Sequence, residues 1–144
     1  MAHITFYEKP GCGGNGRQKA LLEAAGHTLD VRNLLSTAWT ADHLLRFLSP
    51  WPVADWFNRA APRVKSGEVV PEQLDAQAAL ALLRAEPLLI RRPLMEAGGQ
   101  TLVGFDPTLV DRLWGLTAEG ARLPAARAEG CAAALRPEAS PSGA

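Results

Sequence analysis

The stretch between residues 4 and 31 constrains the fold more than any other part of the chain. Residues 4–7 are β-branched or aromatic and precede the breaker-rich segment KPGCGGNG, which predicts a buried strand ending in a tight loop. Residues 17–25 are good helix formers, and Gly26 follows where helices often end in the left-handed conformation. Residues 27–31 suit a second strand. Together these elements predict a βαβ unit, whose strands are parallel and whose crossover is right-handed.

The middle of the chain is predicted to be helical. Thr40 is a suitable N-cap for a helix that ends at Ser49-Pro50, and a short helix is expected over residues 53–60. A third helix is predicted to begin near Pro71, because proline is favoured in the first turn. Its inward-facing residues are expected to be Leu74, Ala78, Ala81, Leu82 and Ala85.

The segment after residue 87 returns to strands. In LMEAGGQTLVGF, Gly98-Gly99 separates two short runs, which predicts a β-hairpin. Asp106-Pro107 then opens a helix that is expected to end near Thr117. Beyond Gly120 the residues are mostly Ala, Gly, Pro, Arg and Ser, a composition that cannot build more core.

The order β-α-β, helices, β-β-α is typical of an α/β protein with a thioredoxin-like core and a helical insertion, here at about residues 40–86. A chain of 144 residues has room for one domain. That domain is predicted over residues 1–118, and residues 119–144 are expected to form a low-complexity, flexible tail.

Composition argues against several classes of function. Lys plus Arg and Asp plus Glu each number 15, so no net charge is available to attract a nucleic acid or an anionic membrane. The first residues show no signal-peptide pattern, and no apolar run is long enough to span a membrane, so a cytoplasmic location is expected. The two cysteines and three histidines are scattered, and no metal site is expected from their spacing.

Cys12 is the candidate catalytic residue. It follows the first predicted strand and starts the first helix, where unpaired backbone N–H groups and the helix dipole favour an anion such as a thiolate. Gly13 and Gly14 leave the backbone open to a substrate oxyanion or to another sulfur, and Arg17 could neutralise the charge. The alternative is that Cys12 is an inert, buried small residue.

Residues 12–17, CGGNGR, also resemble the phosphate cradle of the low-molecular-weight tyrosine phosphatases. In that family one more residue separates the cysteine from the arginine. A loop that wraps a phosphate tolerates little shortening, which argues against a phosphatase.

Two segments resemble the ArsC/Spx family of arsenate-reductase-like proteins: ITFYEKPGCGGNGRQKALLEAAGH, and LLIRRPLM with a hairpin and GFDP after it. The resemblance covers about residues 3–117. Within that family the chain is most similar to nitrogenase-associated proteins, through EKPGC and VADWFNRAAPRVKSGEVVPEQL. The resemblance implies a thioredoxin-like core with a helical insertion, and a cis-proline at Pro93 that faces Cys12.

Arsenate reductases of this type use a cysteine that attacks arsenate, followed by glutathione and glutaredoxin, and three arginines that hold the oxyanion. The resemblance assigns one arginine position to Arg92. The second falls on Asn58 or the adjacent Arg59, and the third falls on Gly104-Phe105, where no cation is present. Each missing charge-assisted hydrogen bond should cost roughly 1.5 to 3 kcal/mol of oxyanion binding.

Two other positions depart from the family. The residue four before the cysteine is Glu8 instead of a histidine, and a carboxylate there would raise the pKa of the thiol. Spx-type regulators carry a second cysteine three residues after the first, where this chain has Asn15. Any disulfide of Cys12 must therefore involve glutathione, another protein or Cys131.

Three functions follow as hypotheses. The first is a cytoplasmic thiol-redox protein whose Cys12 forms a mixed disulfide with glutathione as co-substrate, or with a protein partner such as glutaredoxin. The second is a non-catalytic accessory or binding protein in nitrogen fixation. The third is a glutathione- and glutaredoxin-dependent arsenate reductase. No bound cofactor is expected for any of them.

Overall fold

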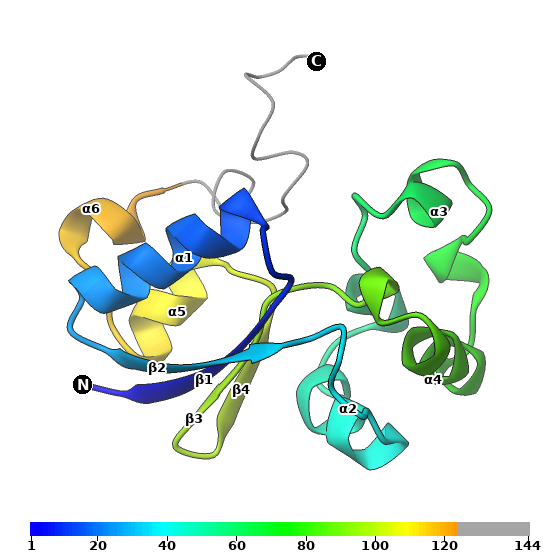
Figure 1. Cartoon of the computed structure of the whole chain (residues 1–144), viewed down its shortest axis with the longest axis horizontal. Coiled ribbons are helices and arrows are strands. Elements are labelled where there is room, and N and C mark those ends of the chain that lie inside the picture. Colours follow the sequence, from blue (N-terminus) through cyan, green and yellow to red (C-terminus); the bar gives the residue numbers. More distant parts are fainter. Residues whose placement is uncertain (124–144) are drawn as a thin grey trace.

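The computed structural model describes residues 1–123 and contains one four-stranded sheet within them (Figure 1). The strands are β1 (His3–Glu8), β2 (Thr28–Asn33), β3 (Leu94–Ala97) and β4 (Gln100–Val103), in the spatial order β2-β1-β3-β4. Strand β2 is parallel to β1, whereas β3 is antiparallel to both β1 and β4. The α-helices are α1 (Gly13–Ala24), α2 (Ala41–Leu48), α3 (Pro62–Lys65), α4 (Ala76–Ala85), α5 (Pro107–Leu113) and α6 (Ala118–Ala121). Short 3₁₀ helices are η1 (Val53–Trp56), η2 (Pro71–Gln73) and η3 (Pro87–Leu89). This is the predicted α/β fold, a thioredoxin-like core with a helical insertion.

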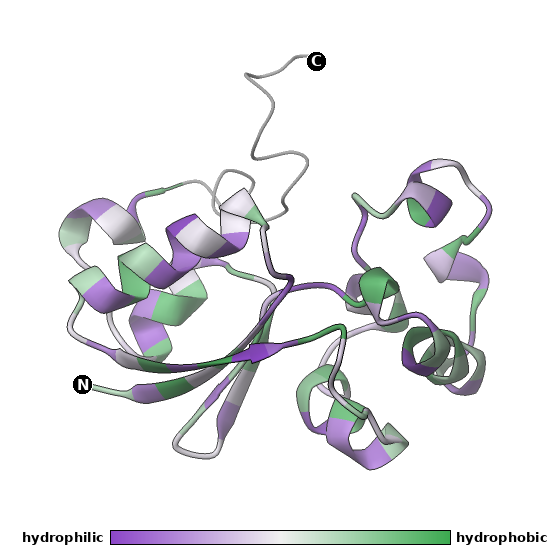
Figure 2. Ribbon diagram, in the orientation of Figure 1, coloured by the Kyte–Doolittle hydropathy of each residue, from purple (hydrophilic) through white to green (hydrophobic). Residues whose placement is uncertain are grey.

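Strand β1 contributes to two apolar clusters, one on each face of the sheet. Ile4 and Phe6 are fully buried in a cluster with residues of α1 and α5, whereas Tyr7 lies in a second cluster with residues of the insertion. Successive residues of a strand point to opposite faces, so a single six-residue strand serves both clusters. Figure 1 shows α1 and α5 close together, with α2, α3 and α4 grouped apart from them. Hydrophobic residues occur in both groups (Figure 2).

Several local predictions are confirmed at the ends of elements. Helix α2 begins after Thr40, whose Oγ1 accepts the N–H of His43 at 3.1 Å. Gly98 and Gly99 form the turn between β3 and β4 and have φ values of 57° and 80°, which glycine adopts at little cost. Helix α5 begins after Asp106, as predicted.

The predicted start of the helix near Pro71 was wrong. Residues 71–73 form only the 3₁₀ turn η2, and α4 begins after Asp75, whose Oδ1 accepts the N–H of Ala78 at 2.8 Å. A side-chain N-cap fixes a helix start more strongly than a proline that merely fits its first turn. The buried face also differs from the predicted one. The fully buried residues of α4 are Ala79 and Leu83, whereas Ala78, Ala81 and Ala85 are exposed.

Other boundaries differ by a few residues. The second strand runs on to Asn33, and η1 ends at Trp56 instead of residue 60. Helix α3 was not predicted. Helix α6 begins at the junction where the tail was expected, and residues 124–144 of that tail, Cys131 among them, lie outside the described residues. Within residues 1–123, no helix is long and apolar enough to cross a membrane.

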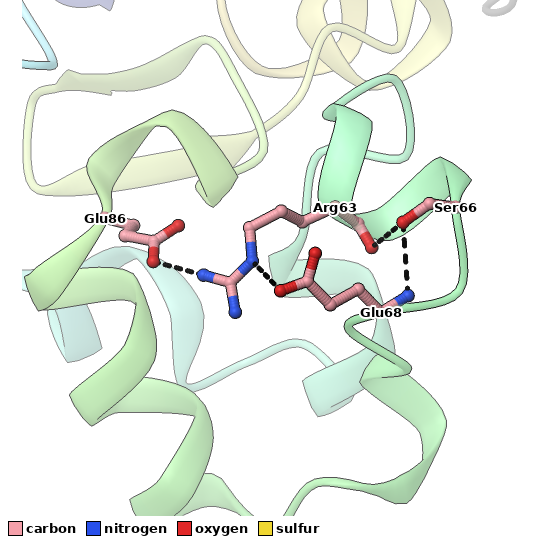
Figure 3. A network of polar contacts seen from close by, with 4 residues as sticks. All are labelled: Arg63, Ser66, Glu68 and Glu86. Carbon is pink, nitrogen blue, oxygen red and sulfur yellow. Dashed lines mark hydrogen bonds and ion pairs between the residues drawn. The ribbon is translucent and has the colours of Figure 1, made fainter.

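The insertion is tied together at its surface by a polar network around Arg63 of α3 (Figure 3). The guanidinium of Arg63 pairs with Glu86, which follows α4, and its Nε donates to Glu68 Oε2 at 3.1 Å. Ser66 Oγ donates to the Arg63 carbonyl at 3.2 Å and accepts the Glu68 N–H at 3.3 Å. Such exposed pairs contribute little individually. Their role here is to hold the loop after α3 against the end of α4.

Candidate functional site

Cys12 is the N-cap of α1. Its backbone is extended, with φ −80° and ψ 116°, and its Sγ accepts a hydrogen bond from the N–H of Asn15 at 3.4 Å. The Cys12 N–H donates to the carbonyl of Lys9 at 3.1 Å, which closes the loop between β1 and α1. Only 8% of Cys12 is exposed. The Cys12 sulfur thus receives a hydrogen bond at the positive end of the helix dipole.

The other predicted residues of this loop take different positions. Gly14 is buried and Gly13 is half-buried in the first turn of α1, whereas Arg17 is exposed one turn further on. The carboxylate of Glu8 pairs with Lys19 Nζ at 2.6 Å. Lys19 therefore offsets the charge that was expected to disfavour a thiolate at Cys12.

Arg92 and Pro93 lie beside the strand that leads into this loop. The Arg92-Pro93 peptide bond is cis, as the resemblance implied. Strands β1 and β3 pair Tyr7 with Leu94, so extending the register by one residue sets Pro93 next to Glu8. The carbonyl of Pro93 accepts the N–H of Gly104 at 2.8 Å. The loop carrying Cys12 and the Arg92-Pro93 pair thus leave the sheet at neighbouring positions.

Arg92 is a buried cation. It is 6% exposed, and its Nε and Nη1 have no hydrogen-bond partner in the part of the chain that the structure describes. Burial lowers the pKa of its guanidinium from the ordinary value. A buried charge without a partner is costly, and such groups commonly serve a ligand. The chemistry of the donors suits an anion, such as a carboxylate or an oxyanion.

Asn58 and Arg59 separate into two environments. Asn58 is buried, and its N–H donates to the carbonyl of Leu89 at 2.8 Å, while the N–H of Arg91 donates to Trp56 at 2.9 Å. In this short antiparallel pairing Phe57 lies opposite Ile90, so Asn58 pairs at Leu89, three residues before Arg92. Arg59 is exposed and its Nη2 pairs with Glu72 Oε2 at 2.6 Å.

The structure therefore brings together two groups of predicted residues at one end of β1 and β3, Cys12 with Gly13 and Gly14, and Arg92 with Pro93. Asn58 is linked to the chain that leads to Arg92 by its hydrogen bond to Leu89. Arg59 is occupied by an ion pair on the insertion surface, and Arg17 is exposed on α1. No group of three or more His, Cys, Asp and Glu side chains within residues 1–123 is arranged to hold a metal ion.

A parallel β1-α1-β2 unit, a cysteine at the start of α1 and a cis-proline before β3 define a thioredoxin-like protein. The family model described as the ArsC family matches residues 18–113, and the chain belongs to the ArsC family. The matched range includes Arg92 and Pro93 but begins after Cys12.

Relatives with known sequences and structures are similar over most of the chain. An uncharacterized 15.7 kDa protein of Rhodospirillum rubrum, named for the draG 3′ region, is 50% identical over 119 residues, or 83% of each chain. The structure of an arsenate reductase from Vibrio cholerae is 26% identical with a TM-score of 0.65, and covers 78% of this chain and 98% of that one. An arsenate reductase (ArsC) related protein from Brucella melitensis is 26% identical with a TM-score of 0.60, covering 79% and 96%.

His43 is a residue to which sequence reasoning gave no role. Its ring lies against Trp39 with centroids 4.6 Å apart, and its Nε2 is 3.4 Å from the hydroxyl of Tyr7. Only its position in α2, one turn before the buried Phe47, could have indicated this environment. Burial, together with the charges of Arg46 and Arg32, lowers the pKa of His43 from the ordinary value.

The lowered pKa of His43 predicts a loss of stability in mild acid. The unfolded chain takes up a proton near the ordinary histidine pKa of about 6.5, whereas the folded protein resists protonation, so stability falls as the pH drops below about 6.5. Above that pH, His43 contributes no pH dependence. The His43→Gln variant should show a flatter free energy of unfolding between pH 7.5 and 5.5 in urea titrations. The control variant is His3→Gln, because His3 is exposed. An equal loss of stability in acid in His43→Gln and in the parent protein would contradict the prediction.

Proposed function

We propose that this protein is a thiol-redox protein in which Cys12 acts as a nucleophilic thiolate and forms a mixed disulfide with glutathione. The observation that carries the proposal is the contact between Cys12 Sγ and the Asn15 N–H at the start of α1. In the reduced protein the same N–H would favour the anionic form of the sulfur, and the thiolate is the form that attacks. The cis-proline next to the end of β1 agrees with the same chemistry.

The reaction is a thiol–disulfide exchange. The Cys12 thiolate attacks one sulfur of oxidised glutathione, a new sulfur–sulfur bond forms, and the old one breaks to release a glutathione thiolate. A second thiolate, from glutathione or a protein such as glutaredoxin, then attacks the glutathione sulfur and restores the Cys12 thiolate. Arg92 supports this proposal because glutathione carries carboxylates, the kind of anion that its unpartnered Nε and Nη1 would bind. Asn58, Gly13 and Gly14 would line the same region, with Arg17 nearer the solvent.

The test uses the full chain with the substitution Cys131→Ser. The sequence has two cysteines, so this variant keeps Cys12 alone. With oxidised glutathione, intact-protein mass spectrometry should show one glutathionyl adduct. The rate of its formation should follow an apparent thiol pKa below the ordinary value of about 8.5. A reaction that follows an ordinary thiol pKa, or no adduct on Cys12, would overturn the proposal. In the chain with both cysteines, replacement of the adduct by an intramolecular disulfide would identify Cys131 as the resolving thiol.

A second candidate is an accessory role in nitrogen fixation without turnover. It is favoured by the resemblance of the VADWFNRAAPRVKSGEVVPEQL segment to nitrogenase-associated proteins, and by the Rhodospirillum rubrum relative whose name refers to draG. In a nitrogen-fixing host, an unchanged phenotype of the Cys12→Ser variant would favour this role over thiol chemistry.

Arsenate reduction is the third candidate, favoured by the Vibrio cholerae enzyme. Gly104-Phe105 supplies no third cation, so we expect a glutaredoxin-coupled assay to show no arsenate-dependent oxidation of NADPH.

A further inference from the structure

Asn15 is a buried polar residue in the first turn of α1 that the exchange reaction itself does not use. It is 1% exposed, and its side-chain amide makes hydrogen bonds in two directions. Oδ1 accepts the N–H of Lys9 at 2.9 Å, and Nδ2 donates to Gln18 Oε1 at 2.8 Å. The Lys9 N–H can only donate, so the amide oxygen must face it and the orientation of the amide is fixed. Buried polar groups satisfied in this way rigidify their surroundings.

These contacts link Asn15 to Cys12 by a short chain of hydrogen bonds. The Lys9 N–H is held by the Asn15 side chain, and the Lys9 carbonyl accepts the N–H of Cys12 at 3.1 Å. The Asn15 N–H in turn donates to Cys12 Sγ. Gly11, inside the loop, has a φ of 80°, a conformation that glycine adopts readily. The side chain of Asn15 therefore fixes the loop at Lys9, while its backbone donor meets the sulfur.

We propose that, when Cys12 is reduced, Asn15 is a positioning residue that keeps the Cys12 sulfur in hydrogen-bonding contact with the start of α1 and so holds its thiolate form. This inference rests on the proposed thiol chemistry and assigns a role to a residue outside the predicted site. The side chain acts at a distance from the sulfur, through Lys9, and the backbone N–H acts on it directly. A hydrogen bond to the charged form of an acid lowers its pKa, so loosening this contact raises the pKa of Cys12.

The experiment compares two replacements in the Cys131→Ser background by following thiolate absorbance and the rate of glutathionyl adduct formation against pH. Asn15→Asp keeps the size and the acceptor for the Lys9 N–H, but it removes the donor to Gln18 and adds a negative charge. Asn15→Ala removes both hydrogen bonds without adding charge. The matched control is Gln77→Glu, which makes the same amide-to-carboxylate change at an exposed position of α4.

The expected result is a rise in the Cys12 thiol pKa of about one unit or more in both variants, larger in Asn15→Asp, and no change in Gln77→Glu. Where the thiol pKa lies above the assay pH, the exchange rate should fall only about three-fold for each unit, because a more basic thiolate is also more nucleophilic. A purely structural role would lower the melting temperature without moving the pH profile. If the parent protein has a low thiol pKa and folded Asn15 variants keep it, the role of Asn15 is refuted and the proposed thiol chemistry is not. An ordinary thiol pKa in the parent protein refutes both proposals.

Discussion

Replacing Arg92 by methionine is expected to stabilise the protein while weakening its reaction with glutathione. The guanidinium is buried, and two of its nitrogens have no hydrogen-bond partner within residues 1–123. Methionine fills a similar volume without a charge to desolvate, so the free energy of unfolding should rise by about 1–3 kcal/mol. Loss of one charged hydrogen bond to a glutathione carboxylate should slow adduct formation about ten-fold or more.

Urea unfolding and the rate of adduct formation measure the two effects of Arg92→Met separately. The control is Arg112→Met, which removes the same charge from an exposed position of α5 and should change either quantity little. A variant at Arg92 that is less stable than the parent protein would show that the guanidinium is a structural group with partners of its own. Unchanged kinetics would remove Arg92 from the site.

Truncating Phe6 to alanine should cost about 3–5 kcal/mol of the free energy of unfolding, because its fully buried ring lies at the centre of β1 in the cluster shared with α1 and α5. Its partner across the parallel pair is Val31 in β2, which is 42% exposed. Val31→Ala in the same sheet should cost only about 0.5 kcal/mol or less.

Denaturant unfolding of the two variants compares a central and an edge position at one register of the sheet. Because β1 also leads into the Cys12 loop, Phe6→Ala in the reduced Cys131→Ser background should raise the accessibility of Cys12 to alkylating reagents under mildly denaturing conditions. Equal costs for the two truncations would contradict the arrangement in which β1 is central and β2 lies at the edge.

Local signals with one strong physical cause were predictable from the sequence. The loop at Cys12 follows from four glycines and a proline after a β-branched run, and the hairpin follows from Gly98-Gly99. Thr40 marked a helix start as an N-cap, and the Asp106-Pro107 pair marked another through a proline that suits the first turn. The cis form of the Arg92-Pro93 bond came from the family resemblance, since nothing in a single sequence distinguishes it from a trans bond.

Two kinds of feature were not predictable: which of several nearby residues starts a helix, and contacts between residues that are distant in the sequence. The helix start was predicted at Pro71, and only the structure shows that it lies after Asp75, whose side chain caps the helix. The charge of Glu8 is offset by Lys19, a contact between a strand and a helix that no local pattern reveals. Asn15 was noted only as a missing second cysteine, because its two-sided hydrogen bonding depends on the fold of the loop.

The division of β1 between two apolar clusters has a consequence for how such a chain can change over generations. A segment inserted into a finished domain can vary or be deleted freely, but this one covers a sheet face that Tyr7, Leu94 and Val103 would otherwise expose. Deleting it would uncover an apolar surface directly behind the strands that lead to Cys12 and from Arg92. Substitutions in the insertion and in the part of the sheet that carries Cys12 therefore constrain one another. A new binding surface on the insertion must leave its packing against this sheet face intact.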